Sequence, residues 1–206
     1  MRFRFVQRGL ALDLACGSGR HVRALSKHTW TVGLDLSMEL LAVAESEFAG
    51  APYVRADIRE LPFQDQAFDL VVNLFTSFGY FSSDSENRHV LDEVSRVLKR
   101  GGNLVIDYLN ADQVRAELVP QDTCKVGNRL VTQIRRITPD GRYVEKEISA
   151  DGFERTYMER VRLFEPDDIR CLLHDAGLDI DRELGDYAGG PIDGESPRAI
   201  FFAHRS

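Results

Sequence analysis

The sequence predicts an α/β fold in which helices wind around a mostly parallel sheet. The first half of the chain alternates short apolar strands with helical patterns, which is typical of such a sheet. A buried strand at residues 10–14 leads through a turn of small residues, 15–19, into a helical pattern at 20–28. This order indicates half of a nucleotide-type binding site. Residues 129–164 then read as antiparallel strands.

Length, charge and composition limit the possible classes of protein. The chain has 206 residues, 43% of them hydrophobic, and a formal net charge of -7. This suits one globular domain, residues 1–206, and disfavours a broad nucleic-acid surface. Three scattered cysteines, Cys16, Cys124 and Cys171, indicate free thiols in a reducing compartment.

Targeting and metal-binding patterns are also missing from the sequence. The basic segment 1–8 is too short for a transit peptide, and no apolar run reaches membrane-spanning length. We therefore expect a cytoplasmic protein. The histidines lack metal-ligand spacing, so we expect no metal. The sequence leaves the oligomeric state open, with a homodimer as one possibility.

Apolar periodicity predicts the elements of the first half. We expect strands at 10–14, 31–34, 52–55, 68–74 and 103–108, and helices at 20–28 and from Ser37 to Phe48. A further helix follows Ser83, which has capping-box spacing to Glu86. Gly101-Gly102 is predicted to end that helix.

The second half carries the antiparallel pattern. Strands are expected at 129–137, at 142–149 and up to Phe164, and together they form a three-stranded insertion within about residues 110–164. A helix then begins at Pro166 and ends at Gly177, and strands follow at 178–187 and 198–204. Charged and apolar residues alternate along the insertion, so one of its faces is expected to be wet or to line a site.

The turn at residues 15–19 is the first candidate for ligand binding. A dinucleotide fingerprint needs three glycines, because a pyrophosphate approaches the helix start closely. Here Gly17 and Gly19 fit, but Val22 stands at the third position. A ligand without a pyrophosphate tolerates this difference. Two glycines alone are also compatible with a tight turn that binds nothing.

Two acidic residues after later strands extend this candidate site. Asp35 ends the second strand, where a carboxylate can accept hydrogen bonds from both ribose hydroxyls. Asp57 follows the third strand and precedes Ile58. There the carboxylate can accept from an adenine amine while Ile58 packs on the ring. The alternative role of Asp57 is to cap a turn.

Five segments in order resemble the motifs of class I S-adenosylmethionine-dependent methyltransferases. They are Leu12 to Gly19, Gly33 to Ser37, Ala56 to Phe63, Phe68 to Asn73, and Leu98 to Gly102 with the strand that follows. The resemblance implies a Rossmann-like, doubly wound, mostly parallel seven-stranded sheet whose last strand is antiparallel, with the three-stranded insertion after strand five. It also implies S-adenosylmethionine as the cofactor.

The resemblance assigns cofactor roles by position. Asp13, Ala15, Cys16, Gly17, Ser18 and Gly19 would order or contact the methionine part. Asp35 with Leu36 would hold the ribose, and Asp57 with Ile58 the adenine. Asn73 and Leu74 would face the sulfonium and the acceptor.

The acceptor pocket is expected to be aromatic on one side and covered by the insertion. The loop after the fourth strand contains Phe75, Phe78, Tyr80 and Phe81 and lacks the two prolines of adenine- and glutamine-directed N-methyltransferases. At least two of these aromatics are expected in the core. The insertion resembles the substrate-covering sheet of small-molecule N-methyltransferases, and its acceptor candidates include Arg135 and Tyr143.

These observations together predict methyl transfer to a small molecule, with an amine favoured because it needs only a neutral lone pair. No catalytic base can be named from the sequence. The alternatives are a nicotinamide-dependent oxidoreductase, disfavoured by Val22, and a protein that binds S-adenosylmethionine without turnover. Relatives usually carry several dozen residues before the first motif, often a helix that closes over the site, whereas nine residues precede Leu10 here. Either the start is misassigned, the chain is a natural truncation, or another segment supplies the cover; a missing cover would weaken ligand binding and admit water.

Overall fold

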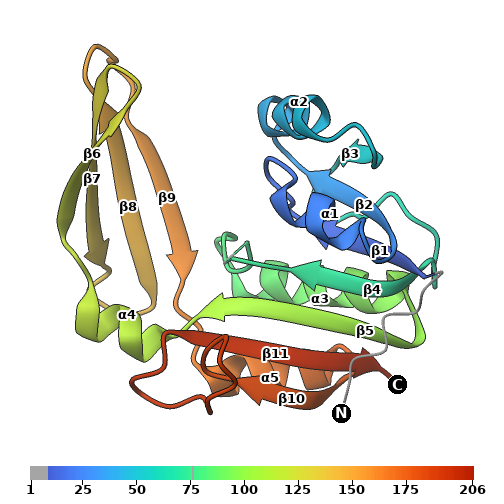
Figure 1. Ribbon diagram of the computed structural model, residues 1–206. Coiled ribbons are helices and arrows are strands. Elements are labelled where there is room, and N and C mark those ends of the chain that lie inside the picture. Colours follow the sequence, from blue (N-terminus) through green and yellow to red (C-terminus); the bar gives the residue numbers. More distant parts are fainter. Residues whose placement is uncertain (1–8, 76) are drawn as a thin grey trace.

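The structure, a computed structural model, describes residues 9–75 and 77–206 and contains two β-sheets (Figure 1). The basic segment 1–8 therefore lies outside the described residues. The larger sheet comprises β1 (Leu10–Leu14), β2 (Trp30–Asp35), β3 (Tyr53–Arg55), β4 (Phe68–Asn73), β5 (Leu98–Leu109), β10 (Leu178–Leu184) and β11 (Arg198–Arg205). The smaller sheet comprises β6 (Gln121–Val126), β7 (Arg129–Ile137), β8 (Tyr143–Ala150) and β9 (Tyr157–Arg162). The helices are α1 (Arg20–Leu25), α2 (Met38–Glu47), α3 (Asp84–Val97), α4 (Ala111–Glu117) and α5 (Pro166–Asp175).

The larger sheet has the predicted seven strands, in the order β10-β11-β5-β4-β1-β2-β3. All neighbours are parallel except that β11 runs antiparallel to both β5 and β10. The chain builds outward from β1 to β3 on one side and from β4 on the other. The order therefore reverses between β1 and β4, and ligands of such sheets bind at the carboxyl ends of the strands at this point.

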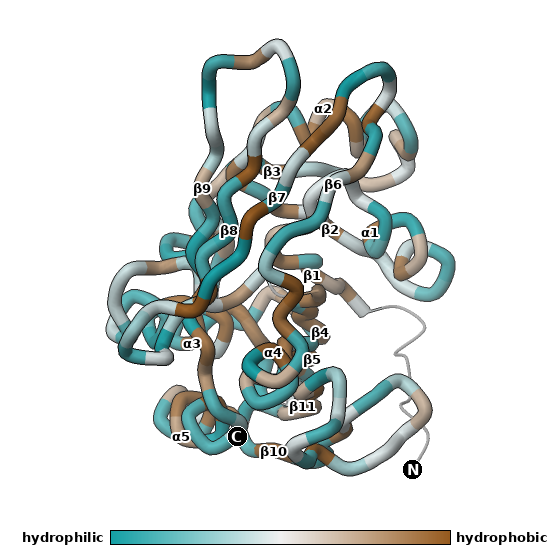
Figure 2. Tube along the Cα trace, turned by 90° about the vertical axis from the view of Figure 1, so that its left-hand side faces the viewer, coloured by the Kyte–Doolittle hydropathy of each residue, from teal (hydrophilic) through white to brown (hydrophobic). Residues whose placement is uncertain are grey.

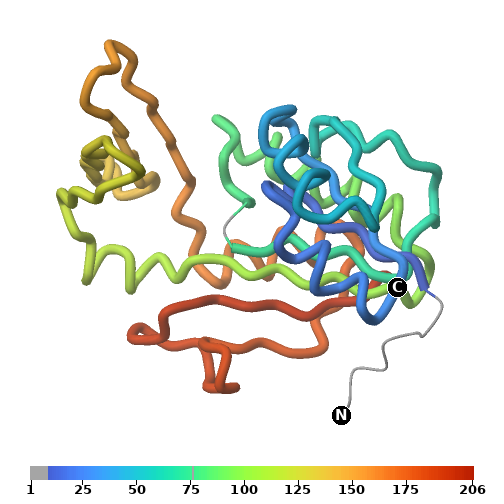
Figure 3. Tube along the Cα trace, turned by 45° about the horizontal axis from the view of Figure 1, so that its top comes forward, coloured from blue at the N-terminus to red at the C-terminus, as the bar shows by residue number. Residues whose placement is uncertain are grey.

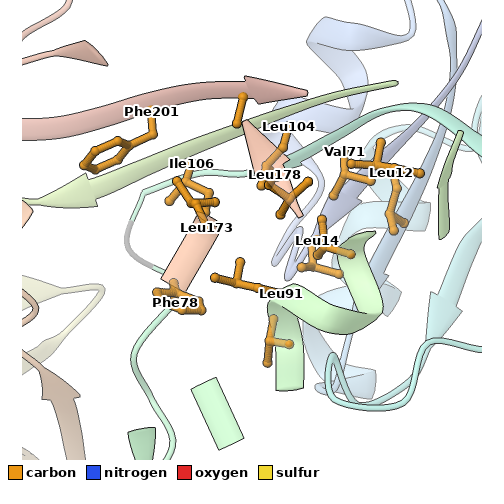
Figure 4. Packing of buried hydrophobic residues seen from close by; sticks show 14 of the residues in the cluster. Leu12, Leu14, Val71, Phe78, Leu91, Leu104, Ile106, Leu173, Leu178 and Phe201 are labelled. Carbon is orange, nitrogen blue, oxygen red and sulfur yellow. The ribbon is translucent and has the colours of Figure 1, made fainter. Parts of the chain in front are cut away.

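The main core lies between this sheet and the helices α3 and α5 (Figure 4). Leu12 of β1, Val71 of β4 and Ile106 of β5 point into it, together with Leu91 of α3 and Leu173 of α5. All five side chains are buried. Each buried aliphatic side chain contributes about 1.5–3 kcal/mol, so the edge of the sheet that carries the site is rigidly supported.

The capping prediction for α3 is confirmed, but the predicted end of that helix is wrong. Ser83 and Glu86 form the reciprocal capping box. The helix ends at Val97, and β5 already begins at Leu98. Gly101 has a φ of 70°, and the pairing of β5 with β4 changes register between Phe68 and Leu70. The two glycines therefore form an irregularity inside the strand, which is a common position for glycine.

The insertion contains four antiparallel strands, so the prediction of three is corrected. The additional strand is β6, which pairs along its whole length with β7. All six residues of β6 are exposed. Such an edge strand has no buried face and therefore no apolar alternation that a sequence could reveal.

The charges of the insertion pair across its strands. Arg136 contacts Glu145 at 2.7 Å, and Lys146 contacts Glu159 at 2.5 Å. Figure 2 shows hydrophilic and hydrophobic residues interspersed along β6 to β9. The alternating charges seen in the sequence are therefore largely cross-strand pairs, which modestly stabilise a sheet.

The second sheet projects from the larger one where β5 ends and α5 begins (Figures 1 and 3). One of its contacts with the main domain runs through Arg162 of β9. The Arg162 amide donates to the Gly79 carbonyl at 2.8 Å, and the Tyr108 hydroxyl donates to the Arg162 carbonyl. Among the described residues, no helix is long and apolar enough to cross a membrane.

Candidate active site

The turn after β1 is built from residues in left-handed backbone conformation. Ala15, Gly17 and Gly19 have φ values of 59°, 55° and 77°. A Cβ atom on Gly19 would lie 2.8 Å from the Tyr53 hydroxyl and 2.9 Å from Cβ of Ala44. Gly19 is therefore required for close packing. A Cβ atom on Gly17 would meet nothing within 4 Å, so Gly17 instead leaves an open approach to the backbone.

Asp35 connects this turn to the start of α2. Its Oδ2 accepts a hydrogen bond from the Gly17 amide at 2.8 Å, and its Oδ1 accepts from the Ser37 amide at 2.9 Å. A carboxylate has about four acceptor positions. Asp35 can therefore hold the turn in place and still accept hydrogen bonds from a ligand.

Asp13 and Asn73 place two buried acceptors beneath the turn. Both side chains are buried, and neither Asp13 Oδ2 nor Asn73 Oδ1 has a hydrogen-bond partner in the described part of the chain. Burial and the nearby Asp35 charge raise the pKa of Asp13 to about 7, although a hydrogen bond from the Val22 amide and the charge of Arg20 oppose this. Buried polar atoms without partners are rare and often mark functional sites.

A cavity of about 190 Å³ opens between the turn and the loop after β4. Phe75 lies on its wall with a φ of 65°, an uncommon backbone conformation for a bulky residue that often marks a functional site. The cavity is lined by Ala15, Cys16, Gly17, Ser18, Arg20, His21, Leu74, Phe75 and Ser77. Six predicted positions of the turn and loop thus meet there. Thr76, in the same loop, lies outside the described residues.

The other acceptor candidates do not line this cavity. Phe78 is in the core, where its ring packs against Tyr108 and Phe164. Tyr80 is about half exposed, and desolvation by its surroundings raises the pKa of its hydroxyl. Phe78 was predicted as a pocket residue, and the correction follows from its burial.

Arg135 and Tyr143 belong to the second sheet and serve contacts there. Arg135 pairs with Asp122 at 3.3 Å and lines a separate cavity of about 390 Å³ beside α4. Tyr143 is buried, and its ring lies 3.9 Å from the Arg160 guanidinium. The structure therefore does not bring either side chain to the cavity at the glycine turn.

The Asp57 carboxylate is engaged by the turn that follows it. Its Oδ1 accepts from the Arg59 amide at 2.9 Å, and its Oδ2 pairs with the Arg59 guanidinium at 2.7 Å. Arg59 holds the pKa of Asp57 below its usual range. This geometry matches the turn-capping role. Ile58 packs against the edge of the main core.

Sequence reasoning missed a polar cluster beside the cavity. The buried Asp107, near the end of β5, accepts from Tyr187 Oη at 2.7 Å and pairs with Arg198 Nε at 2.7 Å. The guanidinium carbons of Arg198 and Arg20 lie 5.6 Å and 4.5 Å from the centre of the Phe75 ring. These residues come from distant parts of the chain, so only the fold brings them together.

Comparisons with known proteins agree with this geometry. A family profile described as "Methyltransferase domain" matches residues 11–102. A demethylmenaquinone methyltransferase of Thermotoga maritima is 30% identical over 178 residues, which cover 84% of this chain and 71% of the relative. This chain belongs to the class I S-adenosylmethionine-dependent methyltransferases.

Two further similarities are to a curated methyltransferase and to a solved structure. A dTDP-3-amino-3,6-dideoxy-alpha-D-glucopyranose N,N-dimethyltransferase of Streptomyces fradiae is 27% identical over 187 residues, covering 86% of this chain and 73% of that protein. The crystal structure of an S-adenosylmethionine-dependent methyltransferase from Clostridium acetobutylicum superposes with a TM-score of 0.85 at 22% identity. It covers 98% of this chain and 85% of that one. S-adenosylmethionine is thus the cofactor of the family. Among the described residues of the methyltransferase, no group of His, Cys, Asp or Glu could hold a metal ion.

Proposed function

We propose that this methyltransferase binds S-adenosylmethionine at the carboxyl edge of β1, β2 and β4 and methylates an amine nitrogen of a small molecule. The observation that carries the proposal is the cavity shared by the glycine turn and the Leu74–Phe75 loop. It lies where the strand order reverses, the position at which sheets of this kind bind ligands.

The turn and the two buried acceptors suit the methionine part of the cofactor. Gly17 leaves space for close approach, and Asp13 Oδ2 and Asn73 Oδ1 are acceptors without a donor. The cofactor's ammonium group supplies donors, directly or through a water. Ala15, Cys16 and Ser18 would complete this part of the site, with Gly19 allowing the close packing behind the turn, and Leu74 would lie beside the sulfonium.

The remaining cofactor contacts are proposed by position. Asp35 and the adjacent Leu36 would hold the ribose, since the Asp35 carboxylate lies beside the Gly17 backbone. Ile58 would pack against the adenine. An adenine amine that binds Asp57 would have to replace part of the Arg59 contact, because that guanidinium already occupies the carboxylate.

The bound cofactor supplies a methyl group that is already activated as an electrophile. The protein therefore has to bring the acceptor close, orient it and exclude water. Good orientation alone contributes roughly 7–11 kcal/mol. His21 lines the cavity, and burial and the charge of Arg20 lower the pKa of its ring. A neutral His21 imidazole can accept the proton that an amine must lose.

The amine is favoured by the aminosugar N,N-dimethyltransferase, which is similar over most of this chain. A second candidate acceptor is a carbon atom of a quinol, because the demethylmenaquinone methyltransferase is also similar over most of this chain. Both are small molecules, so the two candidates share the cofactor site and differ only in the acceptor.

Methyl-labelled S-adenosylmethionine tests the proposal directly. The protein is incubated with separate panels of primary amines, including amino sugars, and of quinols, and the transfer of label is measured. We expect label in an amine and cofactor binding that is lost in Asp35→Ala. If label were transferred only to a quinol, the second candidate acceptor would replace the amine in the proposal. Absence of S-adenosylmethionine binding would contradict the proposed site.

A further inference from the structure

We propose that Arg20, stacked on Phe75 beside Arg198, anchors an anionic group of the methyl acceptor, a phosphate or a carboxylate. This inference deepens the proposed function, on which it rests, by stating the chemical class of the acceptor. It assigns a role to the polar cluster of Arg20, His21, Asp107, Tyr187 and Arg198, none of which the cofactor contacts require.

The charges of the cluster do not cancel. Asp107 and Arg198 form a close pair that is mostly buried, with side chains 5% and 18% exposed. Tyr187 occupies the other oxygen of Asp107. Arg20 has no carboxylate partner within hydrogen-bonding or ion-pair distance among the described residues, and its guanidinium lies 4.5 Å from the centre of the Phe75 ring. One positive charge is thus left without a paired negative charge.

The neighbouring titratable groups leave this positive surplus in place, because His21 adds little charge and Asp13 only partly offsets it. The pKa of His21 is lowered, first by desolvation and then by Arg20, although Asp107 acts in the opposite direction. The ring is therefore mainly neutral at pH 7. Asp13 is buried beneath the turn, and its raised pKa of about 7 leaves it only partly charged. The whole chain is acidic, with a net charge of -7, so a positive surplus here does not follow from composition.

Phe75 fixes where the guanidinium of Arg20 lies. A guanidinium over an aromatic face gains about 0.5–1 kcal/mol at an exposed site, and the planar group keeps its five donors. Arg198 lies 5.6 Å from the same ring. The two cations therefore lie near one exposed ring that lines the cavity. Planar, multiply donating groups of this kind suit phosphate and carboxylate oxygens.

The competing explanation is that Arg20 binds the carboxylate of the cofactor itself. The position of Phe75 favours the acceptor, because its ring lies between Arg20 and Arg198 of β11, which pairs with Asp107. The two explanations predict different behaviour toward S-adenosylhomocysteine, which carries the cofactor's carboxylate but no methyl group to transfer.

The test measures binding of inorganic phosphate and of acetate to the full chain by titration calorimetry, with and without saturating S-adenosylhomocysteine. Arg20→Gln is compared with Arg20→Lys, which keeps the charge, and with Arg23→Gln, an exposed arginine on the same helix. We expect phosphate or acetate to bind the S-adenosylhomocysteine complex, and Arg20→Gln to weaken this by at least about fivefold. Arg20→Lys should lose less of the anion affinity, and Arg23→Gln should bind the anion as tightly as wild type.

The affinity for S-adenosylhomocysteine separates the possible outcomes. Under the proposal it is the same in all four proteins, and phosphate does not compete with it. Equal weakening of S-adenosylhomocysteine and phosphate in Arg20→Gln, or competition between them, would assign Arg20 to the cofactor and overturn the proposal. Absence of anion binding to a complex that still holds S-adenosylhomocysteine would overturn it while leaving the proposed function intact. Preferred binding of phosphate or of acetate identifies the anion.

Discussion

The Gly17 amide donates to Oδ2 of Asp35 at 2.8 Å, which joins the turn after β1 to the end of β2. The other oxygen of Asp35 accepts from the Ser37 amide, immediately before α2. One carboxylate therefore organises the backbone on both sides of the proposed cofactor site. A residue placed in this way affects binding by direct contact and by preorganisation.

Replacing Asp35 by alanine should weaken binding of S-adenosylmethionine by at least about tenfold, because a charge-assisted contact and the support of the turn are both lost. Asp35→Asn keeps one acceptor oxygen, so its affinity should lie between those of wild type and Asp35→Ala. Titration calorimetry measures the affinities. Glu45→Ala, an exposed acid on α2, is the matched control and should bind normally. Unchanged affinity in Asp35→Ala would contradict the ribose assignment.

Asp13 should make the stability of the fold depend on pH. Burial and then Asp35 raise its pKa from 3.8 to about 7. Between these values the folded protein holds a proton that the unfolded chain has released. The Asp13 contribution to the free energy of unfolding therefore falls as pH rises from about 4 to about 7, by up to about 4 kcal/mol. Above pH 7 this contribution no longer changes with pH.

Asp13→Asn cannot titrate, so its stability relative to wild type should rise across that pH window. Urea unfolding at several pH values measures the difference, and using the difference removes the contributions of other carboxylates. Desolvation tends to raise the pKa of Asp69, but contacts with Lys99 and the Leu10 amide together lower it. The stability of Asp69→Asn relative to wild type should therefore fall as pH rises. If the difference in free energy of unfolding between Asp13→Asn and wild type stayed constant with pH, the pKa of Asp13 would not be raised in the folded protein.

Two phenylalanines of the loop after β4 should behave differently. Phe78 is fully buried against Tyr108 and Phe164, so Phe78→Ala should cost about 3–5 kcal/mol of stability. Phe75 is 57% exposed, and Phe75→Ala should change stability by less than about 1 kcal/mol. Methyl transfer, in contrast, should fall in Phe75→Ala. Chemical unfolding and the labelled-methyl assay together measure both effects, and equal losses of stability would contradict these placements.

The larger sheet could be predicted because its central strands are nearly continuous apolar runs separated by helical periodicity. Strand β4 and the capped helix α3 show this pattern. Local spacing also indicates the tight turn at Gly17 and Gly19 and the acid that ends β2, and the structure joins the two by the hydrogen bond from Gly17 to Asp35. These signals lie within one strand, turn or helix start.

The missing parts depend on contacts between distant residues. Strand β6 has no buried face, so its pairing with β7 leaves no pattern. Asp107 meets Tyr187 and Arg198 across 80 and 91 residues of sequence. Each of these residues alone has an ordinary surface explanation. The sequence predicts a pocket of aromatic residues after β4, but it does not indicate which of these side chains turn into the core, as Phe78 does.

The attachment of the second sheet should depend on Asp84 at the start of α3. Its two oxygens pair with Arg162 at 3.1 Å and with Arg142 at 2.8 Å, and the Arg162 side chain is only 9% exposed. Removing the carboxylate leaves a buried guanidinium with fewer partners, which costs about 1–3 kcal/mol. Asp84→Ala should therefore lower stability and speed hydrogen exchange in β8 and β9. Asp175→Ala breaks an exposed pair with Arg88 and should cost less than about 1 kcal/mol. Equal effects of the two variants on exchange in β8 and β9 would show that Arg162 does not fix this sheet to the main domain.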